Sequence, residues 1–242
     1  MARRKRAQAG FGDFATWAEA APARSFINRE QIVRQALALL DDVGFDGLTM
    51  RRLAERLGVQ AASLYNHVRD KNELLALIAD AICGEVPDLD PRRPWREQLQ
   101  AMAWDYRRVL MAHRDAARVL AATPPVGPSR LWIIEQVLAA LRGAGFTDED
   151  MVDAAWVGNT YVVGFVLDET LGVAVSEGAA ASADEVRAQL KQWFKGLPPE
   201  RYATLIALTD HLVDASSERR FGFGFTALLD GLERRLASRR AT

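Results

Sequence analysis

The chain has 242 residues, of which 49% are hydrophobic, enough for one sizeable packed core or two small ones. Its net charge of −1 gives the whole molecule no general attraction to nucleic acid. The single cysteine, Cys83, excludes an intramolecular disulfide framework; because apolar residues precede it, we expect a buried, inert thiol, with a redox sensor as the alternative. The sequence has no run of about 18 apolar residues, and its basic start is not followed by an apolar signal core. We therefore expect a cytoplasmic protein without a membrane partner.

Charge is divided unevenly along the chain. Residues 1–72 hold 12 Lys and Arg against 8 Asp and Glu, whereas the remainder holds 19 against 24. A basic segment is typical of a DNA-binding module. We expect residues 1–27 to be a partly disordered arm, whose basic cluster from Arg3 to Arg6 either enters a DNA minor groove or is a solvated tail.

The first helices are predicted after this arm. Asn28 with Gln31 three residues on forms a capping box, and apolar side chains then recur at helical spacing up to Gly44. Thr49 is the candidate N-cap of a second, short amphipathic helix. Two helices in succession are therefore expected before residue 58.

A glycine turn follows the second helix. Gly58 lies where a helix end favours positive φ, and a third helix is expected from about Gln60 to Val68, with Leu64 and Val68 facing the core. Two short helices joined by such a turn form a helix-turn-helix, whose second helix fits the DNA major groove. The alternative is an ordinary helical hairpin with solvated polar residues.

The outward residues of this third helix are suited to DNA. Small side chains let the backbone approach base edges, amide and hydroxyl groups can hydrogen-bond bases, and Tyr, His and Lys suit phosphate oxygens. The candidates are Gln60, Ala61, Ala62, Ser63, Tyr65, Asn66, His67 and Lys71.

The same stretch resembles the DNA-binding domain of the tetracycline-repressor (TetR) family. The resemblance is carried by Leu53-Ala54, Leu57-Gly58-Val59, Leu64-Tyr65, His67-Val68 and Lys71. It implies that phosphates are held by Thr49, Tyr65, His67 and Lys71, and that bases are faced by Arg51, Ala61, Ala62 and Asn66. It also implies a three-helix DNA-binding domain at 28–72, joined by a linking helix and linker at 73–94 to the rest of the chain.

Beyond the prolines at 87, 91 and 94, only helices are predicted. Their approximate ranges are 95–112, 114–121, 128–143, 148–172, 184–194, 198–214 and 217–238. No run alternates as a strand would. We therefore expect an all-α protein in which residues 95–242 form a larger helical ligand-binding and dimerisation domain.

The resemblance continues through this half and implies a homodimer. Matching positions include Trp95 with Leu99, His113-Arg114-Asp115, Gly145-Phe146 and Phe221-Gly222-Phe223. In such proteins the helices at 148–172 and 217–238 form a four-helix bundle with their two-fold mates. Seam candidates are Val152, Ala155, Trp156, Val163, Val166, Leu167, Phe221, Phe225, Leu228, Leu229 and Leu232; the alternative is that they pack within one subunit.

A ligand pocket is expected among the helices of the second half, apolar with a few polar groups. The candidates are Met102, Tyr106, Leu120, Thr123, Trp132, Gln136, Trp156, Asn159, Thr160 and Asp168. Asn159, Thr160 and Asp168 interrupt an apolar helix, and burying each unpaired would cost roughly 1–3 kcal/mol. They could therefore face a cavity, or instead bridge helices at the dimer seam, and Trp132 could equally be core.

Two departures from the family narrow the effector. In tetracycline-binding members, histidines contact a magnesium-chelated drug, but here Leu120 and Pro87 stand at the matching positions. Because leucine cannot coordinate a hard cation, we expect no metal–tetracycline response. We expect no metal site and no cofactor, because the sequence has no His, Cys or carboxylate spacing typical of zinc and no phosphate-cradling glycine loop. The effector expected instead is more apolar, aromatic or polyketide-like.

The interpretation that follows is a transcriptional repressor that binds palindromic double-stranded operator DNA as a homodimer and is released by a small molecule. A transcriptional activator of the same family is one alternative, and an all-α small-molecule-binding protein or enzyme is another. No catalytic residue is expected, because none of the three histidines has a recognisable nucleophile beside it.

Overall fold

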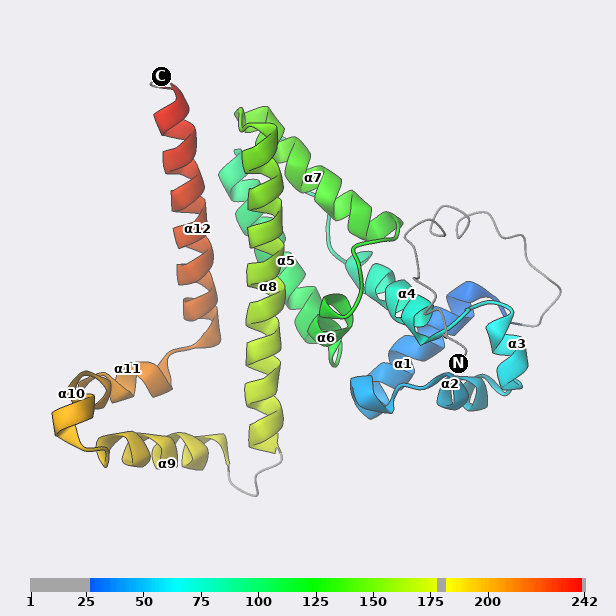
Figure 1. Cartoon of the computed structure of the whole chain (residues 1–242), viewed down its shortest axis with the longest axis horizontal. Helices are drawn as coiled ribbons and strands as arrows, with labels where there is room; N and C mark the ends of the chain where they lie inside the picture. Colours follow the sequence, from blue (N-terminus) through cyan, green and yellow to red (C-terminus); the bar gives the residue numbers. More distant parts are fainter. Residues whose placement is uncertain (1–26, 178–181, 241–242) are drawn as a thin grey trace, which may run out of the picture.

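The computed structural model describes residues 27–177 and 182–240, and within these ranges it contains helices and no strand (Figure 1). This confirms the all-α expectation. Apart from Ile27, the N-terminal arm expected over residues 1–27 lies outside the described residues. The helices are α1 (Arg29–Gly47), α2 (Met50–Leu57), α3 (Ala61–Tyr65), α4 (Lys71–Cys83), α5 (Trp95–Ala112), α6 (Ala116–Ala121), α7 (Pro128–Ala144), α8 (Asp148–Glu177), α9 (Ala183–Lys195), α10 (Pro199–Ala207), α11 (Thr209–Asp214) and α12 (Ser217–Arg240).

The first two helices begin at the predicted caps. At the start of α1, the Asn28 side chain accepts a hydrogen bond from the Gln31 amide, and the Gln31 side chain accepts one from the Asn28 amide. These two bonds complete the capping box. Thr49 caps α2 by accepting from the Arg52 amide, 3.2 Å away. Each side chain satisfies an amide that the first turn of the helix leaves without a partner.

Two glycines of the DNA-binding half have positive φ, and the sequence pattern predicted this for Gly58. Gly58 (φ 68°) ends α2, and Gly44 (φ 70°) kinks α1 rather than ending it. A Cβ added at Gly44 would lie 2.9 Å from Oδ2 of Asp115, so the kink also admits a neighbouring segment.

The reading helix α3 is shorter than predicted. Leu64 and Val68 are fully buried, as expected, but α3 stops at Tyr65 and only turns follow it. Beyond the helix end, Nε of Arg29 donates to the His67 carbonyl at 3.1 Å, which joins the turn after α3 to the start of α1. The sequence pattern could not reveal this partner, which lies 38 residues earlier.

Helix α4 lies between the two halves of the molecule. One part of its surface packs against α1, and other parts pack against α5, α6 and α7. Its fully buried side chains are Leu74, Ile78, Ala79 and Ile82. Both halves therefore share one hydrophobic core, and α4 cannot tilt without disturbing both.

The C-terminal half is a set of long helices. In Figure 1, α8 stands upright with α12 beside it, α5 and α7 cross behind and beside α8, and α9 to α11 form a separate turn of helices at the foot. The single helix expected over 198–214 is wrong, because Leu208 leaves helical geometry (φ −97°, ψ 7°) and divides it into α10 and α11. No glycine or proline marks this break, which is why the pattern missed it.

An aromatic cluster joins α5, α8 and α12. Phe221 is fully buried, with Trp104, Phe165 and Tyr161 at ring-centroid distances of 4.8, 5.2 and 5.5 Å. The expectation that Val163, Val166, Phe221, Phe225 and Leu229 could form a dimer seam is therefore wrong for these five, which are buried within one subunit. They face inward because the aromatic side chains of three helices meet there.

Candidate DNA-binding surface and effector cavity

The candidate DNA-binding residues lie on and around α2 and α3, at the end of the molecule remote from α9 to α11 (Figure 1). Gln60, Ala61, Ala62 and Asn66 are exposed, and Ser63 is half-buried. Tyr65 is 50% exposed, although it is large and partly apolar. The burial of Leu64 on the opposite side of α3 leaves these side chains turned outward.

The flanking candidates already have local partners. Arg51 is 87% exposed in its side chain, and its Nε lies 2.8 Å from Glu55, an i,i+4 ion pair in solvent. Nζ of Lys71 donates to the Phe45 carbonyl at 3.4 Å and lies over the Phe45 ring. His67 is half-buried. Solvent-exposed ion pairs contribute little, so Arg51 is free to exchange Glu55 for another acceptor.

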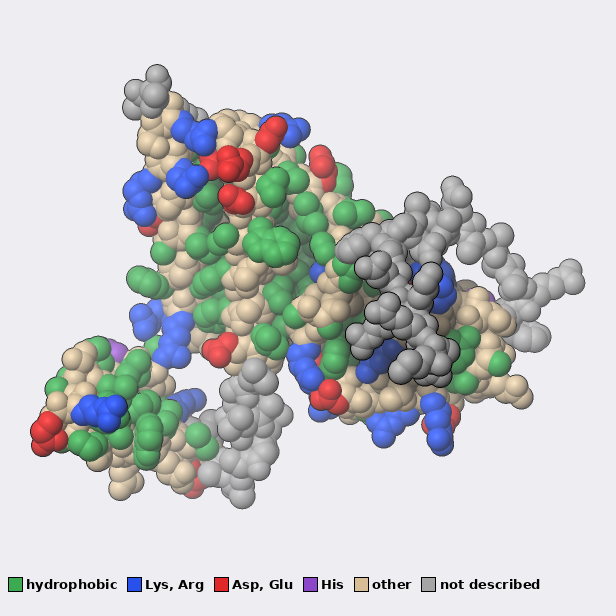
Figure 2. Space-filling model, in the orientation of Figure 1, with side chains coloured by type: hydrophobic (Ala, Val, Ile, Leu, Met, Phe, Trp, Pro, Cys, Tyr) green, Lys and Arg blue, Asp and Glu red, His purple; other side chains and the backbone are tan. Residues whose placement is uncertain are grey.

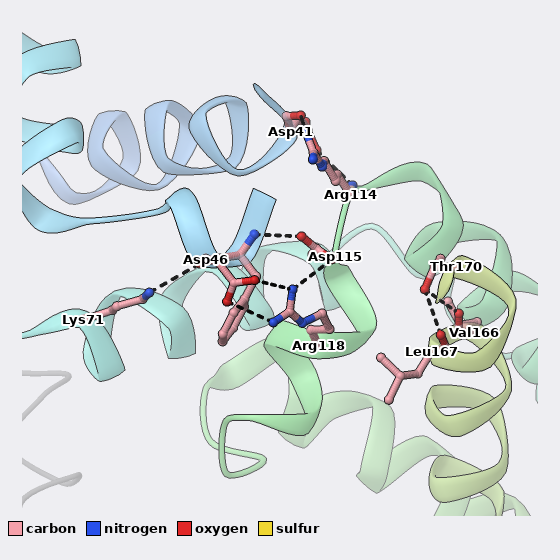
Figure 3. A network of polar contacts seen from close by, with 10 residues as sticks. Asp41, Asp46, Lys71, Arg114, Asp115, Arg118, Val166, Leu167 and Thr170 are labelled. Carbon is pink, nitrogen blue, oxygen red and sulfur yellow. Dashed lines mark hydrogen bonds and ion pairs between the residues drawn. The ribbon is translucent and has the colours of Figure 1, made fainter. Parts of the chain in front are cut away.

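A polar junction connects the start of α6 with the end of α1 (Figure 3). Asp115 accepts from the Phe45 amide at 2.7 Å, and Arg118 pairs with Asp46 at 3.0 Å. The Arg118 guanidinium, by hydrogen bond and charge, holds the pKa of the Asp46 carboxyl below its usual range. Arg114 donates to carbonyls of the same α1 segment. The start of α6 is thus bonded to the end of α1, the helix that precedes the helix-turn-helix.

The Thr170 side chain, in the neighbouring part of α8, bonds to the backbone of its own helix. In the same view, the Thr170 hydroxyl donates to the Val166 and Leu167 carbonyls, 2.9 and 3.1 Å away (Figure 3). These bonds run within one helix and cross to no other element. The junction to the DNA-binding half therefore belongs to α6 rather than to this part of α8.

A cavity of about 640 Å³ opens among α4, α5, α7, α8 and α12. Its walls are mostly aliphatic; α7 contributes Ile133, Ile134, Val137 and Leu138. The hydrophobic side chains gathered over α8 and the adjoining face of α12 are visible in Figure 2. The volume and the apolar lining suit a drug-sized organic molecule.

Four of the ten candidate ligand residues line this cavity: Met102, Tyr106, Trp156 and Asn159. The Tyr106 hydroxyl donates to Oδ1 of Asn159 at 3.4 Å, which joins α5 to α8. Trp156 is 72% exposed, so it forms the rim of the cavity rather than its interior.

The other six candidates lie elsewhere. Trp132 points outward, 53% exposed, and its Nε1 donates to Asp88 at 2.6 Å. Gln136 accepts from the Leu89 amide at 2.7 Å. Leu120, Thr123, Thr160 and Asp168 do not line the cavity, the first two being buried and the last two exposed.

Exposure also bears on the polar groups in α8. Thr160 and Asp168 are exposed in the single chain, so neither is buried unpaired within it, and their alternative role at a dimer seam stays a prediction. Thr123 satisfies itself through the Val119 carbonyl, 2.9 Å from its hydroxyl. Only Asn159 behaves as the pattern suggested, with a polar group at the cavity wall.

Polar groups cluster at the end of the cavity near α6. Cys83, Tyr106 and Arg130 all line this part; Tyr106 was expected there, whereas Cys83 and Arg130 were missed as lining residues. Burial raises the pKa of the Cys83 thiol to about 11 and raises the pKa of Tyr106 well above its ordinary value. Both groups are therefore neutral at pH 7. The sequence signal was the apolar stripe that follows Arg130 at helical spacing, but such a stripe looks the same whether it faces a core or a cavity.

This arrangement defines a class: an all-α protein with a helix-turn-helix and, beyond a connecting helix, a larger domain with a ligand-sized cavity. Residues 32–78 match the model of bacterial regulatory proteins of the tetR family, and residues 86–236 match that of the tetracyclin repressor-like C-terminal domain. The chain belongs to the TetR family of transcriptional regulators.

Relatives with assigned roles are similar over most of their length. Tetracycline repressor protein class A from transposon 1721 of Escherichia coli is 35% identical, with 84% of this chain and 89% of that protein covered. The transcriptional repressor DrrR1 of Streptomyces coeruleorubidus is 33% identical, with 87% and 79% covered.

A solved structure with a bound ligand is also similar. ActR of Streptomyces coelicolor in complex with actinorhodin has a TM-score of 0.77 and 33% identity, with 88% of this chain and 99% of that chain covered. Apo ActR gives a TM-score of 0.76.

Among the described residues, no helix is long and apolar enough to cross a membrane.

Proposed function

We propose that this chain is a cytoplasmic, non-enzymatic homodimeric repressor, which binds a palindromic operator and is released when a small molecule fills the cavity. The observation that carries the proposal is that α4 packs on α1 of the DNA-binding half and, through Cys83, also lines the cavity. We also propose the functional boundaries 28–72 for DNA binding, 73–94 for the connection and 95–242 for ligand binding and dimerisation.

Dimerisation is supported by apolar side chains that the single chain leaves in water. Trp156 and Phe223 are 72% and 75% exposed, and Val152 and Val157 are also exposed. They lie on α8 and α12, and exposed apolar surface of this kind marks an interaction site. A two-fold dimer would present two copies of the five-residue α3, which alone reaches few base pairs.

The proposed DNA roles divide into positioning and reading. Thr49, Tyr65, His67 and Lys71 would hold phosphates, and Arg51 would read a base. The remaining proposed reading residues are Gln60, Ala61, Ala62, Ser63 and Asn66. Phosphate contacts fix the register without selecting a sequence, whereas a bidentate arginine contact selects a base.

The proposed effector is largely apolar and aromatic. ActR binds actinorhodin, and its similarity to this chain covers the cavity-forming half. A magnesium–tetracycline response is not expected, because the side chain at 120 is a leucine, which is buried and offers no ligand atom. Calorimetric titration with magnesium and tetracycline would give sub-micromolar binding if this reasoning were wrong.

Release of the operator needs only a modest preference of the ligand for the conformation that does not bind DNA. If the effector favours the released conformation by about 2.7 kcal/mol, operator affinity falls roughly a hundredfold. The junction of Asp115 and Arg118 with the end of α1 gives α6 a direct mechanical connection to the reading head. A small shift of α6 would therefore change the separation of two heads in a dimer.

The test is anisotropy of a labelled fragment of the chain's own promoter, with salt titration. Arg51→Ala should cost about 1–3 kcal/mol on the operator and relax specificity at one position, whereas Tyr65→Phe should weaken operator and random DNA alike. Log affinity should fall steeply with log salt. A monomer that ignores its promoter at low salt would refute the proposal, and a promoter reporter that loses expression on deletion would identify an activator.

A further inference from the structure

The cavity contains a buried charged side chain that has no counter-charge within ion-pair distance. Arg130, in the first turn of α7, is only 7% exposed as a residue. Its Nη1 makes all of its side-chain hydrogen bonds: to the Thr123 hydroxyl at 2.9 Å and to the carbonyls of Pro124 and Thr123 at 2.8 and 3.4 Å. Among the described residues, no carboxylate lies within 4.0 Å of the guanidinium, and Nε and Nη2 donate to none of them.

We propose that the effector carries an acidic group, a carboxylate or an ionised phenol, which pairs with Arg130 at the α6 end of the cavity. The inference rests on the proposed function in that it concerns the ligand of that same cavity. A guanidinium stays charged at all physiological pH values, and buried charges in proteins are normally paired. The protein leaves this pairing to the ligand.

Neighbouring acids cannot supply the missing charge. Cys83 and Tyr106 remain protonated, because burial raises both pKa values. Asp80 is the nearby carboxylate, but it accepts from the backbone amide of Arg130 at 3.0 Å and from the Ser129 hydroxyl at 3.4 Å. It therefore caps the start of α7 and does not reach the guanidinium.

The second arginine of the cavity shows the contrast. Arg235 also lines the cavity, but its guanidinium lies 2.7 Å from Asp150, beyond the far end of α7. That end carries the carboxylates of Asp150 and Asp153, whereas no lining carboxylate accompanies Arg130 at the other end. With aliphatic walls between them, the cavity suits an aromatic acid whose charged end points toward α6.

The anion would also affect the segment that follows α6. Arg130 holds Thr123 and Pro124 by the Nη1 hydrogen bonds described above. An acidic group would take the Nε and Nη2 donors of the same guanidinium, so one side chain would hold both the ligand and the segment that follows α6. The chemistry that recognises the ligand is thus placed beside the element that contacts the DNA-binding half.

The test uses two dyes that differ in charge. The anionic probe 8-anilino-1-naphthalenesulfonate and its uncharged parent N-phenyl-1-naphthylamine are titrated by fluorescence against the full chain and Arg130→Met. We expect the substitution to weaken the affinity for the anionic dye at least tenfold, equivalent to about 1.4 kcal/mol. The affinity for the neutral dye should change less than twofold. Arg130→Lys should give an intermediate loss, because it keeps charge without the planar fork.

Arg142→Met is the matched control, since Arg142 lies on the same helix but its side chain is 74% exposed. This control substitution should leave the affinities for both dyes unchanged. Equal affinity of the wild-type chain and Arg130→Met for the anionic dye would overturn the inference, as would failure of the wild-type chain to bind that dye at about 100 μM. Promoter binding is measured separately, so loss of promoter binding with intact dye selectivity would refute the proposed function alone.

Discussion

Glu73→Gln should destabilise the DNA-binding half without touching a proposed DNA contact. The Glu73 side chain is only 5% exposed and accepts hydrogen bonds from Arg29 at 2.9 Å and from the Arg69 amide at 2.7 Å. Nε of Arg69 approaches at 3.2 Å. One carboxylate thus joins the start of α1, the turn after α3 and the first turn of α4.

The magnitude follows from what an amide can and cannot replace. Glutamine keeps one acceptor oxygen but turns an NH2 group toward an arginine donor, so at least one charge-assisted bond is lost and two donors face each other. Bonds to charged groups are worth about 1.5–3 kcal/mol, and a broken buried pair costs more. Glu73→Gln should therefore cost about 2–4 kcal/mol, or roughly 4–16 °C in Tm for a chain of this size.

Urea unfolding followed by circular dichroism at pH 7 measures this loss. Glu30→Gln is the control: it makes the same chemical change in an i,i+4 pair with Arg34, but its side chain is 84% exposed. It should change the unfolding free energy by less than about 0.5 kcal/mol. If the two variants were equally stable, the carboxylate of Glu73 would not be organising the three segments.

Three further predictions concern single groups. Gly58→Ala should cost about 1–2 kcal/mol in unfolding free energy through backbone strain alone, because φ is 68° and a Cβ there meets no atom within 4 Å; unchanged stability would contradict this. Arg235 lowers the pKa of Asp150 from 3.8, so the stability from this pair should persist above that value and disappear as pH falls through the lower folded pKa; Asp150→Asn should abolish this part of an acid titration. Cys83, with a pKa raised to about 11, should react slowly with a disulfide reagent at pH 8 until urea unfolds the chain, and its contribution to stability should be lost only as pH rises from the unfolded thiol value toward 11.

Local features could be predicted from the sequence because their causes are local. The caps at Asn28 and Thr49, the left-handed Gly58 and the inward pair of Leu64 and Val68 each depend on neighbours within a few residues. Helical periodicity likewise predicted nearly every helix, since it reports which side of a helix is apolar.

Features that depend on distant partners could not be predicted. The turn after α3 is bonded to Arg29 at the start of α1, and Phe221 is buried among aromatic side chains of two other helices. For the ligand candidates, the pattern identified polar residues in α8 but could not tell whether Asn159 or Thr160 faced the cavity. One residue corresponds to about 100° around a helix, so the two neighbours face different surroundings.

The shared core of α4 has a consequence for engineering. A fragment cut after Cys83 would keep the reading helix but lose α5, α6 and α7, which pack against α4, and the apolar surface so exposed would favour aggregation over independent function. Chimeric regulators built from this chain should therefore retain α4 together with α5 to α7 from the same parent, and graft new operator specificity by exchanging only the solvent-facing side chains of α2 and α3.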